Sequence, residues 1–223
     1  MNLIIDFHVH SIYSKDAILS PEKIIRIARR RGLSGVAVTD HDTIRGAMKT
    51  KFATFDDFIV VIGAEVKTDR GEIIGLFLNE EIKSREFVEV IEEIKDQDGI
   101  IVLPHPYRNK QSAPEDLLSE IDMIEGLNAR IPKVLNYKAQ CLARDSGLPM
   151  IGGSDAHTPF EIGRARTVIP GTSDIKDCLL RGKGIIEGRE SLYPVRMLSV
   201  MVGKYRRDGI AGLLKAGINK MKK

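Results

Sequence analysis

The stretch "LIIDFHVH" (residues 3–10) is an apolar segment with the character of a β-strand, and it ends on two histidines. Side chains i and i+2 of a strand point to the same face, so His8 and His10 can present their imidazoles to one ion. The whole chain of 223 residues holds only five histidines. Two of them at the end of the first predicted strand therefore indicate a site at that end of the fold.

The other histidines repeat this placement. They follow the apolar segments of three further predicted strands as His41 in "VAVTDHD", His105 in "IIVLPHPYR" and His157 in "MIGGSDAH". Glu65 lies in "VVIGAEV", and Asp155 stands two residues before His157. In parallel α/β folds the carboxyl ends of the strands meet on one face, where sites are built. A lone histidine there is usually structural, but all five at strand ends favour a shared metal site.

Apolar segments alternate with amphipathic helices along the chain, which is typical of a parallel α/β fold. We expect strands at 3–7, 35–40, 58–66, 71–78, 99–106, 122–128, 149–155 and 166–170. We expect helices at 22–32, 43–52, 84–97, 114–120, 132–146 and 173–182, the first opening at Ser20 and Pro21. Seven or so strands in about 190 residues fit a small or distorted barrel better than an open sheet, but the pattern does not decide between them.

The composition is that of a globular protein, with 43% hydrophobic and 29% charged residues. No apolar run approaches the ~18–20 residues that span a bilayer, and the N-terminus does not resemble a signal peptide. The two cysteines, Cys141 and Cys178, lie in helix-like segments and suggest no disulfide framework. Together these features predict a cytoplasmic protein.

Charge is distributed unevenly. Residues 196–223 hold eight Lys or Arg and one acid, Asp208, so this tail carries +7 and leaves −4 of the net +3 for residues 1–195. We expect a domain over 1–195 and a basic tail over 196–223 that docks as a helix. The alternative is a basic surface for nucleic-acid phosphates or a membrane.

Imidazole and carboxylate ligands together suit zinc, manganese or iron. Seven candidates are too many for one tetrahedral ion, and they are His8, His10, His41, Glu65, His105, Asp155 and His157. The sequence therefore predicts a multinuclear centre, with the Glu65 carboxylate bridging two ions. Ions that share a water lower its pKa, which would leave hydroxide to attack a phosphorus atom.

The motifs "DFHVHSIYSKDA", "VAVTDHDTIRG", "GAEV", "LPHPYR", "IEGLNAR" and "GGSDAHTPFEIGRA" resemble, in content and order, those of the PHP (polymerase and histidinol phosphatase) family. More narrowly, they are similar to its stand-alone metal-dependent phosphoesterases. The resemblance covers residues 1–170. It implies a distorted seven-stranded β/α (TIM-like) barrel, a trinuclear metal centre and the hydrolysis of phosphoesters.

The resemblance also implies a set of ligands. One ion would take His8, His10, Glu65 and Asp155; Glu65 would bridge to a second with His105; a third would take Asp16, His41 and His157. At the position of Asp16 other members have a histidine. "IEGLNAR" lacks a histidine that many members have, which leaves Asn128 or Glu125 to complete the second ion's shell, and we favour Asn128.

Other side chains near these motifs are candidates for catalysis and for substrate binding. His157, Asp40 or a metal-bound water could protonate the leaving group, Asp155 would act with the ions, and Asp40 could instead orient an imidazole. Arginine matches phosphate oxygens with its planar fork. The candidates for that contact are Arg108, Arg130 and Arg164, and a surface salt bridge is the alternative reading for each.

We therefore expect a metal-dependent phosphoesterase with two to three divalent ions, acting through metal-bound hydroxide on a phosphomonoester. A nucleotide or nucleoside bisphosphate is favoured over histidinol phosphate. The enzymatic rival is an exonuclease on short RNA or DNA. The non-catalytic rival is a metal-stabilised module that binds nucleic acid or a polymerase. An amidohydrolase would need a strand-borne lysine, which we do not find. The oligomeric state is left open.

Overall fold

Nine strands form one sheet in the order β7-β6-β5-β4-β3-β2-β1-β8-β9. This architecture comes from a computed structural model, which describes residues 1–54, 57–108, 115–171 and 174–221, with side chains through Ile210. The strands are β1 (Leu3–Val9), β2 (Gly35–His41), β3 (Ile59–Thr68), β4 (Gly71–Leu76), β5 (Ile100–Leu103), β6 (Met123–Asn128), β7 (Met150–Gly153), β8 (Ala165–Ile169) and β9 (Ile185–Gly188).

Six of these strands form two parallel sets that run in the same direction. β1, β2 and β3 pair in parallel, and so do β5, β6 and β7. β4 is antiparallel to both β3 and β5, so the two parallel sets point the same way. The carboxyl ends of six strands therefore meet at one end of the sheet, as the alternation of strands and helices predicts.

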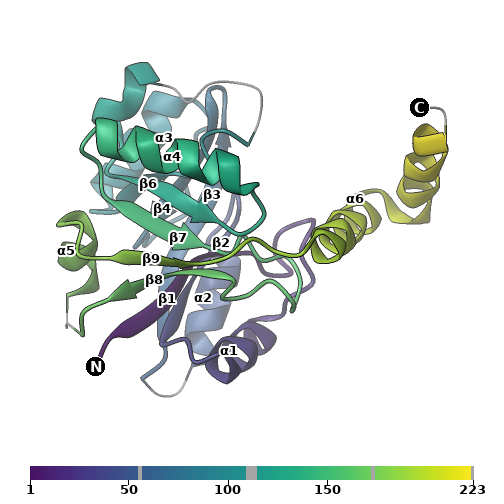
Figure 1. The fold of residues 1–223 in the computed structure, drawn as a ribbon, viewed down its shortest axis with the longest axis horizontal. Helices are drawn as coiled ribbons and strands as arrows, with labels where there is room; N and C mark the ends of the chain where they lie inside the picture. Colours follow the sequence, from purple (N-terminus) through teal and green to yellow (C-terminus); the bar gives the residue numbers. More distant parts are fainter. Residues whose placement is uncertain (55–56, 109–114, 172–173, 222–223) are drawn as a thin grey trace.

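The sheet curls until its two parallel sets meet. A bridge pairs Val9 of β1 with Ala156, which follows β7. The His10 amide donates to the Ala156 carbonyl at 2.9 Å, and the Ala156 amide donates to the His8 carbonyl at 3.3 Å. These bonds bring β7 beside β1 and give a nearly closed barrel, seen from one side in Figure 1.

The expectation of seven strands is corrected to nine within the described residues. β8 pairs antiparallel with β1, and β9 pairs antiparallel with β8, so both lie outside the run of parallel strands. The unexpected strand is β9, which has four residues and is largely exposed. A strand this short, without a buried face, leaves no period in the sequence to detect.

Helices cover the outside of the barrel (Figure 1). They are α1 (Pro21–Arg30), α2 (Arg45–Phe52), α3 (Phe87–Asp96), α4 (Lys133–Asp145) and α5 (Ile175–Leu180), with a 3-10 helix, η1, at Glu115–Glu120. The start of α1 is as expected, because the Ser20 side chain accepts from the Lys23 amide and Pro21 is the first helical residue. Its buried face, with Ile24 and Ala28, packs in the apolar cluster that contains Val38.

The C-terminal helix, α6 (Tyr193–Met221), follows β9 and leaves the body of the protein (Figure 1). Gly209 breaks it with φ 64° and ψ −158°, values that glycine adopts at no steric cost. The helix begins before residue 196, and a division at 195/196 stays a prediction. Among the described helices, none combines the length and hydropathy of a bilayer-spanning segment.

Candidate metal centre

All five imidazoles converge at the carboxyl end of the barrel. His8 lies in β1, His10 follows it, His41 ends β2, His105 follows β5, and His157 comes after β7. The His10 ring is central, with centroids 4.3 Å from His157, 4.5 Å from His41 and 5.0 Å from His8. The strand-end pattern in the sequence therefore corresponds to one cluster in space.

Glu65 of β3 sits in the middle of this cluster and is fully buried. Its Oε2 lies 3.2 Å from His41 Nδ1, 3.3 Å from His10 Nε2 and 3.5 Å from His8 Nε2. Its Oε1 lies 2.9 Å from His105 Nε2. The two oxygens thus face different histidines, which is the arrangement that a bridging carboxylate needs.

Two aspartates flank the cluster. Asp155 Oδ1 lies 3.5 Å from His10 Nε2 and 3.8 Å from His8 Nε2. Asp16 lies on the other side, with Oδ1 at 3.4 Å from His157 Nε2 and Oδ2 at 3.6 Å from His41 Nε2. The predicted histidine, glutamate and aspartate ligands therefore lie together in one cluster.

Ligand atoms within 4.8 Å of one another define four groups of three residues. They are His10, His41 and His157; His8, His10 and Glu65; His8, His105 and Asp155; and Glu65, Glu72 and His105. Glu72 of β4 is absent from the sequence-based set. Glu65 pairs with Ile74 across the β3–β4 hairpin. Since Glu72 lies two residues before Ile74, strand alternation with the hairpin register places it on the face of Glu65.

The donor set fits divalent cations. Glu65 Oε2 and Asp16 Oδ1 are buried atoms without a hydrogen-bond partner. The Nε2 atoms of His8 and His10 face each other at 3.0 Å. Buried carboxylates are costly unless they are paired or coordinate a metal, and imidazole with carboxylate suits first-row transition ions. Unpartnered oxygens and converging ring nitrogens are what a cation would satisfy.

Acidic neighbours favour the charged form of two imidazoles at the centre. Burial lowers the pKa of His8, but the charges of Glu125, Asp155 and Glu65 outweigh burial and hold it well above its ordinary value. His41 shows the same balance. Burial lowers its pKa, but Asp16 and Glu65 favour the protonated ring and raise its pKa to about 9. A site that favours the protonated imidazole favours a positive charge, and a metal ion supplies it.

Two candidate ligands have strained backbones. His105 has a φ of 26° and Asp155 a φ of 52°, in a region that non-glycine residues seldom adopt. Such strain persists only where the surrounding structure over-determines it, and it concentrates at functional sites. A third constraint lies beside them, because a Cβ on Gly153 would stand 2.3 Å from His8 Cβ. Glycine at 153 lets the end of β7 approach His8.

Glu125 supports two of the histidines. Its Oε1 lies 2.9 Å from His8 Nδ1, and its Oε2 accepts from the His105 amide and from Asn128 Nδ2. A carboxylate on Nδ1 fixes the tautomer of His8 and leaves Nε2 as the ligand atom. Asn128 Nδ2 also donates to Asp155, while its oxygen accepts from the Arg130 amide. The Asn128 amide nitrogen thus faces the site, whereas a metal would need its oxygen.

Asp40 is linked to the cluster through the hydroxyl group of Ser14. It accepts from the Ser11 amide at 2.7 Å, from Ser11 Oγ at 2.6 Å and from Ser14 Oγ at 2.7 Å. Ser14 Oγ then lies 3.1 Å from His10 Nδ1. Because the hydroxyl donates to Asp40, it accepts from His10 and leaves His10 Nε2 for an ion. This placement favours the orienting role for Asp40 over that of an acid.

Asp6 is a buried carboxylate that the sequence analysis did not single out. It accepts from Ser154 N at 2.8 Å, from Ser154 Oγ at 2.5 Å and from Gly163 N at 2.7 Å. Burial raises its pKa to about 6, although these donors oppose the shift. Asp6 therefore connects β1 to the segment after β7, which carries the candidate ligands Asp155 and His157. Its place two residues before His8 is the signal that could have found it.

The three arginines separate into two groups. Arg108 Nη1 lies 3.2 Å from Asp155 Oδ2, and Arg130 Nη1 lies 3.3 Å from Asp155 Oδ1, both at the metal centre. Arg164 donates instead to the Phe160 carbonyl and contacts no candidate ligand among the described residues. Arg108 and Arg130 are therefore placed to meet a substrate at the centre, and Arg164 is placed apart from it.

His157 is poorly suited to donate a proton. Burial first, and then the charges of Arg130 and His10, lower its pKa to about 3. Arg130 Nη1 lies 2.7 Å from its Nδ1. A neutral imidazole between Asp16 and Arg130 suits a metal ligand better than a proton donor. The role of general acid toward the leaving group is therefore not favoured for His157.

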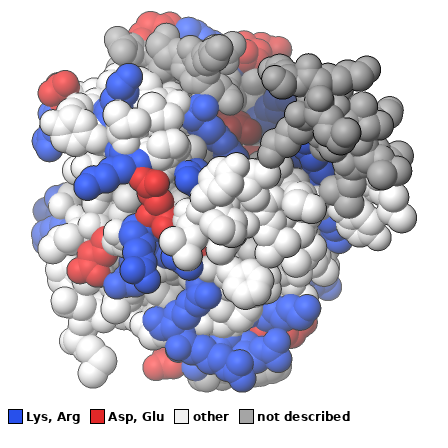
Figure 2. All heavy atoms as spheres, turned by 45° about the vertical axis from the view of Figure 1, so that its right-hand side comes forward, with Lys and Arg blue, Asp and Glu red and all other residues white. Residues whose placement is uncertain are grey.

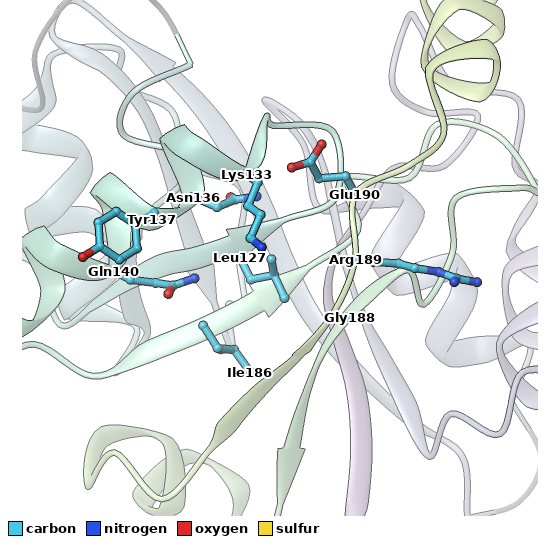
Figure 3. Close-up of a pocket in the computed structure, with 9 residues that line it drawn as sticks. All are labelled: Leu127, Lys133, Asn136, Tyr137, Gln140, Ile186, Gly188, Arg189 and Glu190. Atoms are coloured by element: carbon cyan, nitrogen blue, oxygen red, sulfur yellow. The ribbon is translucent and has the colours of Figure 1, made fainter.

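A separate pocket of about 590 Å³ lies between α4 and β9, and Figure 3 shows its lining. Lys133, Tyr137 and Gln140 come from α4, while Ile186 and Arg189 come from β9 and the segment after it. No histidine lines this pocket. Its Asn136 is buried and bonds the backbone N–H and carbonyl of Asn128, so the pocket wall supports the end of β6.

Comparisons with known proteins agree with this site. Residues 6–145, more than half of the chain, match the model of the PHP domain, and residues 134–183 match that of the PHP-associated C-terminal family. An uncharacterized protein of Methanocaldococcus jannaschii is 41% identical over 138 residues, which are 56% of this chain and 81% of that protein. The chain therefore belongs to the PHP family.

Solved structures share the fold. A two-domain protein of Bacteroides vulgatus with a predicted PHP-like metal-dependent phosphoesterase aligns with a TM-score of 0.73 and 21% identity. That alignment covers 85% of this chain and 65% of the other, so this chain spans just under two thirds of that protein. The lesion-specific endonuclease Q of Pyrococcus furiosus aligns with a TM-score of 0.62 and 19% identity, over 83% of this chain and 58% of that one. Endonuclease Q is also known in complex with a DNA duplex.

Family membership and the site define the class of protein. PHP domains are metal-dependent phosphoesterases, and the cluster provides histidine and carboxylate ligands for such an enzyme. The chain therefore belongs to the class of metal-dependent phosphoric ester hydrolases.

Proposed function

We propose that this enzyme removes a terminal phosphate from a small phosphomonoester, a nucleotide or nucleoside bisphosphate, with two to three zinc, manganese or iron ions. One observation carries the proposal: two arginines from different segments meet at Asp155 inside the ligand cluster. A phosphomonoester carries up to two negative charges and three terminal oxygens. Two guanidinium groups beside a cation site match that density of charge.

The depth of the centre supports a terminal phosphate over an internal one. The side chains of His105 and His157 are 3% and 4% exposed, and that of Arg130 is 11% exposed. His41 and Arg108 reach solvent further, at 30% each. Since most of the cluster is deeply buried, the end of a substrate fits it more readily than the middle of a chain.

The proposed ion sites combine the groups of ligand atoms with the ion-pair distances of Asp16 and Asp155. One set is His8, His10, Glu65 and Asp155, a second is Glu65, His105 and Glu72, and a third is Asp16, His41 and His157. Divalent ions supply Lewis acidity toward phosphoryl oxygens and lower the pKa of water. Glu72 replaces Asn128 in this proposal, because the Asn128 oxygen accepts from the Arg130 amide.

The protein's own residues bind the phosphate, orient the histidine rings and exclude water. Arg108 and Arg130 bind phosphate oxygens and stabilise the charge that grows on them in the transition state. Glu125 holds His8, and Asp40 holds His10 through Ser14, so both rings keep a lone pair toward the cluster. The apolar barrel below keeps bulk water out, which strengthens each electrostatic contact.

A nuclease on short RNA or DNA is the second candidate. The shared fold with endonuclease Q and the basic α6 support it. It requires that a phosphodiester reach the ions, and the depth of the centre works against this. For location we propose the cytoplasm, which the two free cysteines and the charged composition support.

The test begins with chelator-treated protein reloaded with zinc, manganese or iron. Phosphate release is then measured over nucleoside monophosphates, nucleoside bisphosphates, sugar phosphates, histidinol phosphate and short oligonucleotides. We expect metal-dependent release from nucleotides by the native protein, and far slower release by the Asp155→Asn variant. Cleavage of oligonucleotides without activity on nucleotides would establish the nuclease instead. A metal-loaded protein that hydrolyses no phosphoester would reject both.

A further inference from the structure

A second hollow, of about 580 Å³, lies where α6 meets the barrel. Its lining consists of Lys15, Tyr205, Arg206, Arg207 and Gly209. Lys15 comes from the loop after β1, next to the candidate ligand Asp16, and the others come from α6. Three of the five residues are cations and none is an acid. Lys and Arg side chains are also prominent over the face shown in Figure 2.

α6 is seated on this loop by specific contacts. Arg206 Nη2 donates to the Ile12 carbonyl at 2.9 Å, and Arg207 Nη1 pairs with Asp16 Oδ2 at 2.9 Å. Gly203 is buried, and a Cβ there would lie 3.1 Å from Asp16 Cβ, so glycine lets the helix come close. A guanidinium has five N–H donors. Each arginine uses one nitrogen for the body and keeps others for an anion.

The hollow adjoins the metal centre through one carboxylate. Asp16 Oδ2 pairs with Arg207, and Asp16 Oδ1 lies 3.4 Å from His157 Nε2. Arg207 and His157 therefore share the two oxygens of Asp16. The groups of a bound molecule that extended from the cluster past Asp16 would meet Lys15, Arg206 and Arg207.

We propose that Lys15, Arg206 and Arg207 form a second phosphate subsite, which makes the enzyme prefer substrates with another phosphate near the one it removes. The inference rests on the proposed function and names the feature that selects its substrate. The second phosphate of a nucleoside bisphosphate and the next phosphate of a short oligonucleotide share this chemistry. Tyr205, which is 54% exposed, offers a ring on which a base can stack.

The plain alternative is that these arginines only anchor α6. Arg207 is 46% exposed, and exposed ion pairs contribute little. The two roles predict different kinetics. An anchor affects every substrate in the same way, whereas a phosphate subsite affects only substrates that carry the second phosphate.

The experiment compares adenosine 3′,5′-bisphosphate with adenosine 5′-monophosphate on the metal-loaded full chain. The double variant Arg206→Gln/Arg207→Gln should lower the preference in kcat/KM for the bisphosphate by roughly tenfold or more, the effect of losing charge-assisted hydrogen bonds. Arg206→Lys/Arg207→Lys keeps the charge and should retain part of the preference. Arg181→Gln, which removes an exposed arginine of α5 paired with Asp177, should leave the preference unchanged.

Binding supplies a readout that does not depend on turnover. Calorimetry of the bisphosphate with chelator-treated protein should show weaker binding to the Gln double variant than to Arg181→Gln. A 5′-phosphorylated dinucleotide is the second arm. A greater loss for the dinucleotide than for the bisphosphate assigns the subsite to a phosphodiester, and the reverse assigns it to a monoester.

Two outcomes would overturn the inference. Both are visible in the double variant: an equal loss for bisphosphate and monophosphate, or an unchanged preference together with unchanged binding. If the native protein releases phosphate from neither substrate, the proposed function fails, and the calorimetry still decides whether the second phosphate is bound by α6.

Discussion

Two arginines of this protein pair with aspartates in very different surroundings. Arg130 meets Asp155 inside the metal centre, where its side chain is 11% exposed and the carboxylate is fully buried. Arg207 of α6 pairs with Asp16 at the edge of the metal centre, where the arginine side chain is 46% exposed and that of the aspartate is 15% exposed. If its aspartate partner were removed, Arg207 could bond to water instead, whereas the buried Arg130 could not. The same pair of functional groups therefore has different consequences in the two places.

Connections differ as well as exposure. Burial alone would raise the pKa of Asp155, but Arg108, Arg130 and His8 outweigh burial and hold it well below its usual value. Removal of any one of them leaves charge uncompensated on the others. α6 is held at a few polar contacts, of which the Arg206 and Arg207 bonds are exposed. We expect substitutions in the centre to act strongly and together, and those in α6 to act weakly and singly.

The largest effect is expected from Asp155→Asn. The variant removes an anionic ligand at nearly constant shape, so metal content should fall and phosphate release should drop by about 10²- to 10³-fold or more. Metal analysis and a phosphate assay measure the two effects, and circular dichroism checks the fold. Asp177→Asn on the exposed α5 is the matched control. Near-native turnover in Asp155→Asn would show that the cluster is not the catalytic centre.

Glu125→Gln is expected to come next. The amide keeps the shape but loses the charge that orients His8, and changes of this kind cost about 10- to 100-fold in metal affinity or activity. Competition with a metal-binding dye measures the affinity. Glu187→Gln removes an exposed carboxylate that pairs with Arg166 and should have no effect. Equal affinities in the two variants would place Glu125 outside the support of the centre.

Gly153→Ala tests the backbone beside the centre. The added Cβ would clash with His8 Cβ and with Glu125 Oε1, so the free energy of unfolding should fall by about 1–3 kcal/mol. Urea denaturation measures the loss. Gly147→Ala is a useful contrast, since its Cβ would meet nothing within 4 Å, although its φ of 69° carries its own strain. A Gly153→Ala protein as stable as the native one would mean that β7 does not press against His8.

The smallest effect on stability is expected from Arg207→Gln. An exposed ion pair contributes about 0–1 kcal/mol, so unfolding in urea should change little and a moderate salt concentration should remove what change there is. The comparison with Arg130→Gln is the sharpest form of this test. Similar losses in both variants would show that the difference in burial has no energetic consequence.

The strand-end histidines could be predicted because their signal is local. His8, His41 and His105 each come at the end of an apolar segment, and parallel strands bring such ends together whatever the exact strand count. The start of α1 at Ser20 and Pro21 was predicted for a similar reason, since capping depends on a few adjacent residues. The supporting partners had no such signal. Asp6 and Ser154 are 148 residues apart, and Ser14 and Asp40 are 26 apart.

Strand order and side-chain register explain what the sequence left undecided. Glu72 joins the centre because β4 returns antiparallel beside β3, and Asn128 turns its nitrogen inward because Glu125 and Asp155 both accept from it. β9 has no buried face and so no pattern.

The amino-acid order on its own determined the α/β class and the position of the five histidines at strand ends, and it indicated a need for cations, because periodicity and charge are properties of short segments. Only the tertiary structure decided which carboxylate orients which imidazole, which arginines reach the centre and where α6 lies. These depend on contacts between segments far apart in the chain, and the distances that set their strength exist only after the barrel has closed.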